Sequence, residues 1–172
     1  MRWMWIDRVV ELVPRQKLVA IKNVSLAEEH LHDHFAATPT RPALPIMPAS
    51  LILEGMAQTA GLLVGHAGGF QENVVLAKVG NAEWSREVVP GMTIRYTANM
   101  IQYDETGSST RGVVEARDSG SDAPFVQIGS IDIMFSHAGH AMDLKGLGQN
   151  IPSHNFVFGE AFKTLLRTSG VS

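Results

Sequence analysis

One acidic residue, Glu54, interrupts the most apolar stretch of the chain, residues 51–64. A charged carboxylate is costly to bury, so a group in such a place shifts its pKa or finds a partner. Ser50, Glu54 and Gln58 follow one another at intervals of four residues, which places them on one face of a helix. The pattern indicates a polar groove that contains an acid. The alternative is a structural glutamate that caps a loop or pairs with an arginine.

Three histidines, His30, His32 and His34, alternate shortly before this stretch and would share a face of an extended chain. Imidazole is a common metal ligand, but no cysteine and no HExxH pattern accompanies these residues, so we predict neither a metal nor a cofactor. Imidazole also titrates near neutral pH and can remove a proton from a carbon that a neighbouring thioester makes acidic. One of the histidines is therefore a candidate general base, with solvated loop histidines as the alternative.

The candidate base and acid lie on either side of a predicted helix start. Residues 30–48 are rich in proline, which supplies no N–H and restricts the residue before it, so this segment is predicted to be mostly loop. Pro48 suits the start of a helix and Gly68 its end. Apolar residues occupy almost every face between them, which predicts a buried helix.

Strand patterns surround this helix. Residues 93–103 alternate between apolar and polar side chains, and short turns join the later segments, which favours an antiparallel meander. We predict an α+β fold in which one antiparallel sheet wraps around one long central buried helix. A loop from residue 137 and a short closing helix over 156–166 complete the prediction. The predicted strands are 17–24, 74–79, 83–88, 93–103, 110–118 and 124–135.

Composition narrows the function classes. The 172 residues are enough for one domain, and 45% hydrophobic residues are typical of a folded protein. A net charge of -3 without a basic block gives no support for a nucleic-acid partner. The absence of cysteine excludes disulfides and a thiol nucleophile. The first residues do not resemble a secretory signal, and no apolar stretch reaches the length of a membrane span, so we expect a cytoplasmic protein without a membrane partner.

The motifs around the candidate base and acid resemble those of the beta-hydroxyacyl-acyl-carrier-protein dehydratases of fatty acid synthesis. In that family a histidine-phenylalanine pair precedes a proline-rich loop, which leads into the helix that carries the catalytic acid. Here His34-Phe35 precedes the loop, and Pro45-Ile46-Met47-Pro48 leads into Leu51-Ile52-Leu53-Glu54-Gly55-Met56-Ala57-Gln58. The likeness covers about residues 5–136. We therefore divide the chain into a hotdog domain, residues 1–136, and a C-terminal extension, residues 137–172, packed on the same domain.

The resemblance implies a hotdog-fold homodimer, in some members a trimer of dimers, that acts on thioesters carried by an acyl carrier protein. The histidine comes from one subunit and the acid from the other. His34 would remove the C2 proton of a (3R)-3-hydroxyacyl thioester, Glu54 would help the 3-hydroxyl leave as water, and the backbone N–H of Ala49 would face the thioester oxygen. The other residues assigned to the substrate site are Phe35, Met47 and Gln58.

Three departures from the family's pattern affect the loop. Ala36 and Ala37 replace its proline and glycine, the segment between His34 and Glu54 is about six residues longer, and Ala49 stands where glycine is usual. His32 is the alternative base if the loop follows another path. A hotdog acyl-coenzyme A thioesterase and a catalytically silent acyl-binding protein are the alternative functions, because one fold hosts several chemistries.

Overall fold

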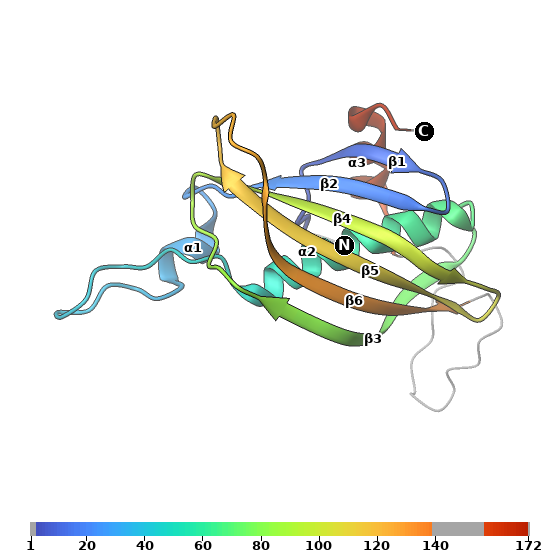
Figure 1. Cartoon of the computed structure of the whole chain (residues 1–172), viewed down its shortest axis with the longest axis horizontal. Coiled ribbons are helices and arrows are strands. Elements are labelled where there is room, and N and C mark those ends of the chain that lie inside the picture. Colours follow the sequence, from blue (N-terminus) through green and yellow to red (C-terminus); the bar gives the residue numbers. More distant parts are fainter. Residues whose placement is uncertain (1–2, 139–156, 172) are drawn as a thin grey trace.

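The computed structural model describes residues 3–138 and 157–171 and contains one six-stranded sheet around a long helix, α2 (Ala49–Ala67) (Figure 1). The strand order is β1-β2-β4-β5-β6-β3, and every neighbouring pair is antiparallel. The α+β architecture predicted from the sequence is confirmed. The strands are β1 (Arg8–Val13), β2 (Lys17–Asn23), β3 (Asn73–Trp84), β4 (Met92–Tyr103), β5 (Gly107–Asp118) and β6 (Val126–Ala138).

Helix α2 packs against β2, β3, β4, β5 and β6. At two places a large side chain packs directly over a glycine of the facing element. Tyr96 of β4 lies over Gly55, so closely that a Cβ there would be 2.5 Å from its ring and hydroxyl. Met56, which is fully buried, occupies the space above Gly112 of β5. Interiors at this packing density leave few voids, so helix and sheet are in direct contact along the middle of α2.

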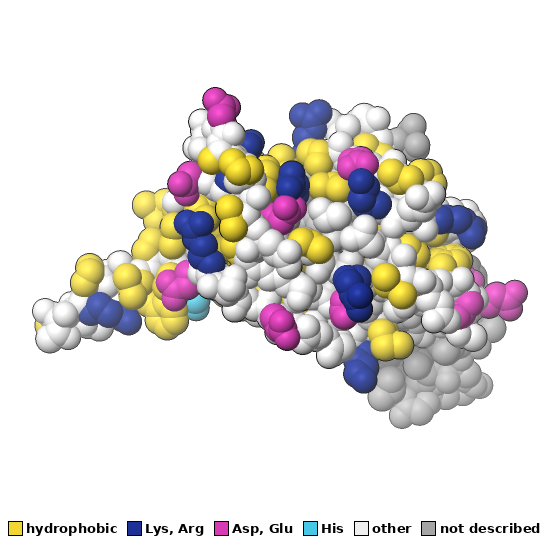
Figure 2. Space-filling view, viewed as in Figure 1, with side chains coloured by type: hydrophobic (Ala, Val, Ile, Leu, Met, Phe, Trp, Pro, Cys, Tyr) yellow, Lys and Arg dark blue, Asp and Glu magenta, His cyan; other side chains and the backbone are white. Residues whose placement is uncertain are grey.

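The opposite face of the sheet is exposed to solvent. Side chains along β5 alternate between buried and exposed positions, as expected for a strand with one face on the core. The outer face carries separate basic and acidic side chains (Figure 2), with Arg95 bound to Glu115 at 2.7 Å and Arg111 to Asp132 at 3.2 Å. Because the two signs are mixed, this face offers no extended patch of one charge.

One predicted strand is shorter than expected, and the loop before α2 contains a short helix. The expected strand over residues 83–88 is wrong beyond Trp84, because the Val88 carbonyl accepts the Met47 N–H at 2.8 Å instead of joining the sheet. Residues 30–48 are mostly loop, as predicted, and a short helix, α1 (Glu29–Asp33), forms before the prolines. The hydrogen bond from Met47 to Val88 attaches the region from Trp84 to Val88 to the segment that precedes α2.

The closing helix exists as α3 (Glu160–Ser169), which lies against β1 and ends at Gly170 in the left-handed conformation. The Val9 N–H donates to the Ser169 hydroxyl at 3.0 Å, which ties helix and strand together. The loop predicted from residue 137 is wrong at its start, because β6 continues to Ala138, and the rest of it lies outside the described residues. The division at residue 137 stays a prediction.

Candidate active site

His34 follows α1 directly, and its ring is fixed by the backbone that precedes α2. Its Nδ1 lies within hydrogen-bonding distance of the Ile46 carbonyl. A carbonyl can only accept, so in the neutral ring the proton sits on Nδ1 and Nε2 keeps its lone pair. The arrangement prepares one nitrogen of His34 to accept a proton.

The longer loop does not carry His34 away from the helix. Residues 35–44 fold back on themselves as a hairpin that projects from the body (Figure 1), with reciprocal backbone hydrogen bonds between Thr38 and Arg41. The Leu44 N–H donates to the Phe35 carbonyl at 2.9 Å and closes the base of the hairpin. The extra residues are accommodated in the hairpin, so the chain returns beside His34 before α2 starts.

The first residue of α2 shares a pocket with His34. The pocket has a volume of about 380 Å³ and contains Ala49 and Ile52 of α2 on one wall. No hydrogen bond among the described residues uses the Ala49 N–H, as expected for the first turn of a helix. This N–H and the positive end of the helix dipole can stabilise an oxygen that gains negative charge in the pocket. The lining residues are His34, Ile46, Met47, Ala49, Ile52, Trp84, Ser85, Arg86, Glu87 and Val88.

Glu54 lies on the other side of α2. It follows Ile52 by two residues, about 200° around a helix of 3.6 residues per turn, so it points away from the pocket that Ile52 lines. Its carboxylate accepts a hydrogen bond from Gln58 Nε2 at 2.9 Å, the contact that their spacing predicts. The expectation of a fully buried acid is wrong: Glu54 is half-buried in the single chain, because its face of α2 is turned away from the sheet. One chain therefore does not bring His34 and Glu54 into one pocket.

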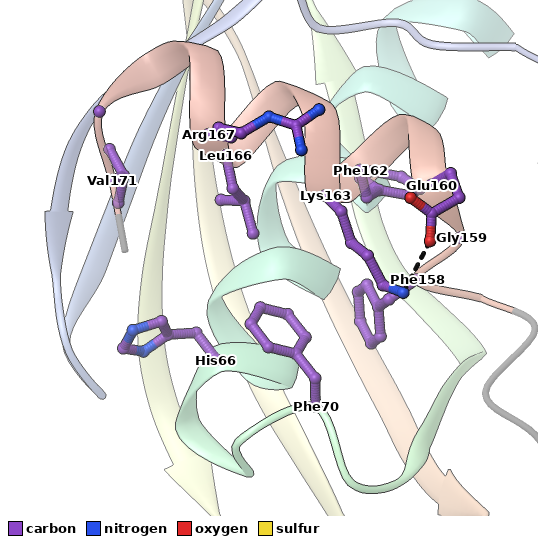
Figure 3. A pocket seen from close by; sticks show the side chains of 11 residues that line it. His66, Phe70, Phe158, Gly159, Glu160, Phe162, Lys163, Leu166, Arg167 and Val171 are labelled. Carbon is purple, nitrogen blue, oxygen red and sulfur yellow. Dashed lines mark hydrogen bonds and ion pairs between the residues drawn. The ribbon is translucent and has the colours of Figure 1, made fainter.

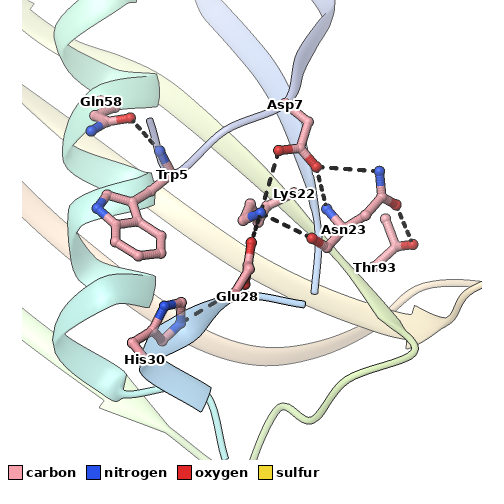
Figure 4. A network of polar contacts seen from close by, with 8 residues as sticks. All are labelled: Trp5, Asp7, Lys22, Asn23, Glu28, His30, Gln58 and Thr93. Atoms are coloured by element: carbon pink, nitrogen blue, oxygen red, sulfur yellow. Dashed lines mark hydrogen bonds and ion pairs between the residues drawn. The ribbon is translucent and has the colours of Figure 1, made fainter. Parts of the chain in front are cut away.

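The N-terminal segment covers this second face of α2. Gln58 accepts from the Trp5 N–H at 2.9 Å (Figure 4). It also donates to the Trp3 carbonyl at 3.0 Å. A buried Lys22 holds the same region by binding Asp7 and Glu28. These contacts fix the surroundings of Glu54 through backbone and charge interactions that no local sequence pattern indicated.

The three histidines do not share a face, because residues 29–33 are helical and not extended. His30 lies 3.8 Å from Glu28 and packs edge-on against Trp5, whereas His32 binds the Leu26 carbonyl at 2.7 Å. Of the three, only His34 lines the pocket that contains Ala49, whereas His30 lines a second pocket with Ser50 and Leu51. Within the described residues, no group of three or more His, Cys, Asp or Glu side chains is placed to hold a metal ion.

A larger pocket, about 960 Å³, lies at the opposite end of α2, under α3 (Figure 3). His66 and Phe70 form one side, and Leu166 and Lys163 of α3 form the other. It contains neither His34 nor Glu54, so its size does not make it the centre of the chemistry.

The other substrate residues predicted from the sequence have different surroundings. Met47 lines the pocket beside His34. Phe35 is half-exposed, with its ring 4.4 Å from that of His34 and under the Arg41 guanidinium. Gln58 is buried among backbone groups. Contact of these residues with substrate stays a prediction. Trp84 and Val88 are pocket walls that sequence reasoning missed. They follow the end of α2 at Ala67 by 17 and 21 residues, and no periodicity joins them to His34.

Comparison with known proteins gives consistent results. A family model described as a FabA-like domain matches residues 2–121. The 3-hydroxyacyl-[acyl-carrier-protein] dehydratase FabZ of Bartonella quintana is 39% identical over 99 residues, 56% of this chain and 60% of that protein. The FabZ of Rhizobium rhizogenes is 30% identical over 130 residues, 75% of this chain and 78% of that protein. The chain thus spans about three fifths of the Bartonella relative.

Solved structures share the fold at low sequence identity. The dehydratase heterocomplex ApeI:P from Xenorhabdus doucetiae has a TM-score of 0.59 at 16% identity, over 86% of this chain and 90% of that chain. A thioesterase family protein from Silicibacter pomeroyi has a TM-score of 0.58 at 11% identity, over 76% of this chain and 83% of that chain. The described helices include none that is long and apolar enough to cross a membrane.

Proposed function

The chain belongs to the FabA-like family, and from that membership we propose that it dehydrates (3R)-3-hydroxyacyl thioesters to trans-2-enoyl thioesters. The substrate is carried by an acyl carrier protein, and the reaction serves fatty acid or related lipid biosynthesis. The observation that carries the proposal is the pocket that joins a preoriented His34 to the free N–H of Ala49. We propose that the protein acts in the cytoplasm, where such a carrier-linked pathway fits.

In the proposed reaction, His34 is the base. Its Nε2 takes the proton from C2, and the electron pair of that bond moves toward the thioester carbonyl, whose oxygen gains negative charge. The Ala49 N–H donates to this oxygen. The pair then forms the C2–C3 double bond as the C3–O bond breaks. Glu54 gives its proton to the departing hydroxyl, which leaves as water, and the proton held by His34 later restores the acid.

The opposite orientations of His34 and Glu54 support a homodimer in which each site takes the base from one copy and the acid from the other. Strand β3 is at the edge of the sheet and pairs only with β6 among the described strands. Its Val75 and Leu76 side chains are exposed. Edge strands with open backbone groups and apolar side chains tend to pair with another chain. We propose that the β3 edges of two copies meet.

The test measures hydration of a short trans-2-enoyl thioester, the reverse reaction. We expect His34→Ala and Glu54→Gln each to lower kcat/KM by about 10²–10⁴-fold, the usual contribution of a general acid or base. His32→Ala is the matched control, because this neighbouring histidine binds the Leu26 carbonyl outside the pocket. Activity that survives in both His34→Ala and Glu54→Gln would end the proposal.

Mixing the two inactive variants tests the shared site. A dimer of one His34→Ala chain and one Glu54→Gln chain contains one site with both groups intact, so exchange of subunits should restore activity. A mixture that forms heterodimers yet stays inactive contradicts a site built from two copies.

The thioesterase alternative has one observation in its favour, the shared fold with the Silicibacter pomeroyi thioesterase family protein. It predicts release of free thiol from a saturated acyl thioester, which a dehydratase does not produce. Tight acyl-thioester binding without turnover would instead indicate a silent binding protein.

A further inference from the structure

We propose that the pocket beside His34 accepts short acyl chains and that Trp84 sets the limit on their length. This inference rests on the proposed function and adds the substrate class. In one chain this pocket has a volume of about 380 Å³, near the lower end of the range of about 300–1,000 Å³ for ligand pockets. In the proposed dimer the second copy supplies Glu54, so the depth of the pocket is set by the walls that belong to the chain with His34.

The inner walls of the pocket are closed. Met47, Ile52 and Val88 are each at most 3% exposed, so packing restricts the movement of their side chains. The backbone hydrogen bond from Met47 to Val88 joins two of these walls. A chain that enters past His34 therefore meets fixed apolar surface, with the polar side chains of Ser85, Arg86 and Glu87 in the remaining wall.

The space beneath α2 offers no continuation. One turn beyond Ile52, Met56 fills the space over Gly112, whose Cβ would lie 2.5 Å from the Met56 sulfur. Tyr96 fills the space over Gly55 with the same clearance. Both side chains are fully buried, and an acyl chain could pass between helix and sheet only if they moved.

Trp84 lines the pocket from the end of β3, where that strand pairs with β6. Its indole ring lies against Gly129, where a Cβ would come within 3.0 Å of the ring. The glycine thus makes room for the indole at the end of β3, where the strand pairs with Gly129 of β6. Trp84 is the largest side chain among the pocket walls, and it is a specificity residue that has no part in the proton transfers.

The experiment compares kcat/KM for trans-2-butenoyl and trans-2-dodecenoyl N-acetylcysteamine thioesters, which removes the carrier protein from the comparison. The variants are Trp84→Phe, Trp84→Leu and Trp84→Ala in the full chain. We expect the wild type to prefer the butenoyl substrate. The ratio of dodecenoyl to butenoyl kcat/KM should rise along the series and gain about tenfold or more in Trp84→Ala, because each methylene accommodated in an apolar pocket is worth about 10–200-fold.

Each outcome is informative. A variant that is partly unfolded loses activity on both substrates, so the ratio still reports pocket length. A wild type that hydrates both thioesters equally well, or a ratio unchanged in Trp84→Ala, overturns the length limit and leaves the dehydratase proposal standing. Absence of wild-type turnover with either substrate overturns both.

Discussion

The two halves of α2 differ in how deeply their side chains are buried. In the first half, residues 49–54, only Ile52 is buried, and Ala49 and Ser50 are exposed. In the second half, residues 55–67, nearly every residue is buried and the glycines contact large side chains directly. Free N–H groups at a helix end can bind a substrate only if the substrate reaches them. A helix in a closely packed interior is instead stabilised by the absence of voids around it. The half with chemistry is therefore open, and the half without it is sealed.

This difference in burial explains why the sequence pattern wrongly predicted a fully buried Glu54. The apolar residues from 51 to 64 predict a uniformly buried helix, yet the buried residues lie mainly in the second half. Glu54 stands at the boundary between the halves, with its carboxylate bound by Gln58 and half-exposed. Its place at that boundary leaves room for a group from a second copy.

The largest expected effect is on the open half. Ala49→Pro removes the one N–H assigned to the thioester oxygen but keeps the helix, because proline suits the first helical position and Pro48 already has an extended ψ of 133°. We expect kcat to fall by about 10²–10³-fold, the usual effect of losing one oxyanion donor. The measurement is kcat for enoyl thioester hydration beside the free energy of unfolding, which should change little.

Ala49→Gly separates the N–H from the side chain. It keeps the N–H and should retain far more activity than Ala49→Pro. If both variants are equally impaired, the Ala49 methyl group matters more than its N–H, and the first half of α2 is not an oxyanion site.

The sequence predicted the local features well and the distant contacts poorly. Pro48 and Gly68 bound α2 as predicted, since the backbone limits of these residues are local. The strands over residues 93–103, 110–118 and 124–135 followed from their alternation and turns, whereas the place of β3 at the edge of the sheet beside β6 did not. The contacts of His34 with Ile46, of Trp84 with Gly129 and of Gln58 with Trp5 depend on how distant segments meet. No periodicity of one segment encodes such a meeting, and the opposed directions of His34 and Glu54 became clear only in three dimensions.

A smaller effect is expected on the sealed half. Gly55→Ala places a Cβ 2.5 Å from the Tyr96 ring, which is fully buried and cannot move aside. Overpacking of this kind costs about 1–3 kcal/mol. Chemical denaturation should show a lower free energy of unfolding, while folded Gly55→Ala keeps most of its turnover.

Gly61→Ala is the matched control on the same helix. Its Cβ would lie 3.9 Å from the nearest atom, on Phe135, which is ordinary contact. Removing a helical glycine without a clash stabilises by about 0.4–1 kcal/mol, so the two glycine substitutions should have opposite signs. Equal destabilisation by Gly55→Ala and Gly61→Ala would mean that the close contact of Tyr96 with Gly55 does not account for the tight packing of the helix.

The smallest effect at neutral pH is expected from Tyr96→Phe. The Tyr96 hydroxyl is buried and has no hydrogen-bond partner among the described residues, so its loss should change the free energy of unfolding by less than about 1 kcal/mol.

At high pH the stabilities of Tyr96→Phe and the wild type should diverge. Burial, reinforced by the nearby Asp7 and Glu28 carboxylates, raises the pKa of Tyr96 far above its ordinary value of 10.0. Above pH 10.0 the unfolded chain releases the phenolic proton of Tyr96, whereas the folded chain keeps it. Wild-type stability therefore falls relative to Tyr96→Phe by up to about 1.4 kcal/mol per pH unit. Denaturation curves of the two proteins at pH values on either side of 10.0 measure this difference. Parallel curves across that range would place the hydroxyl in contact with water and the sealed half of α2 open.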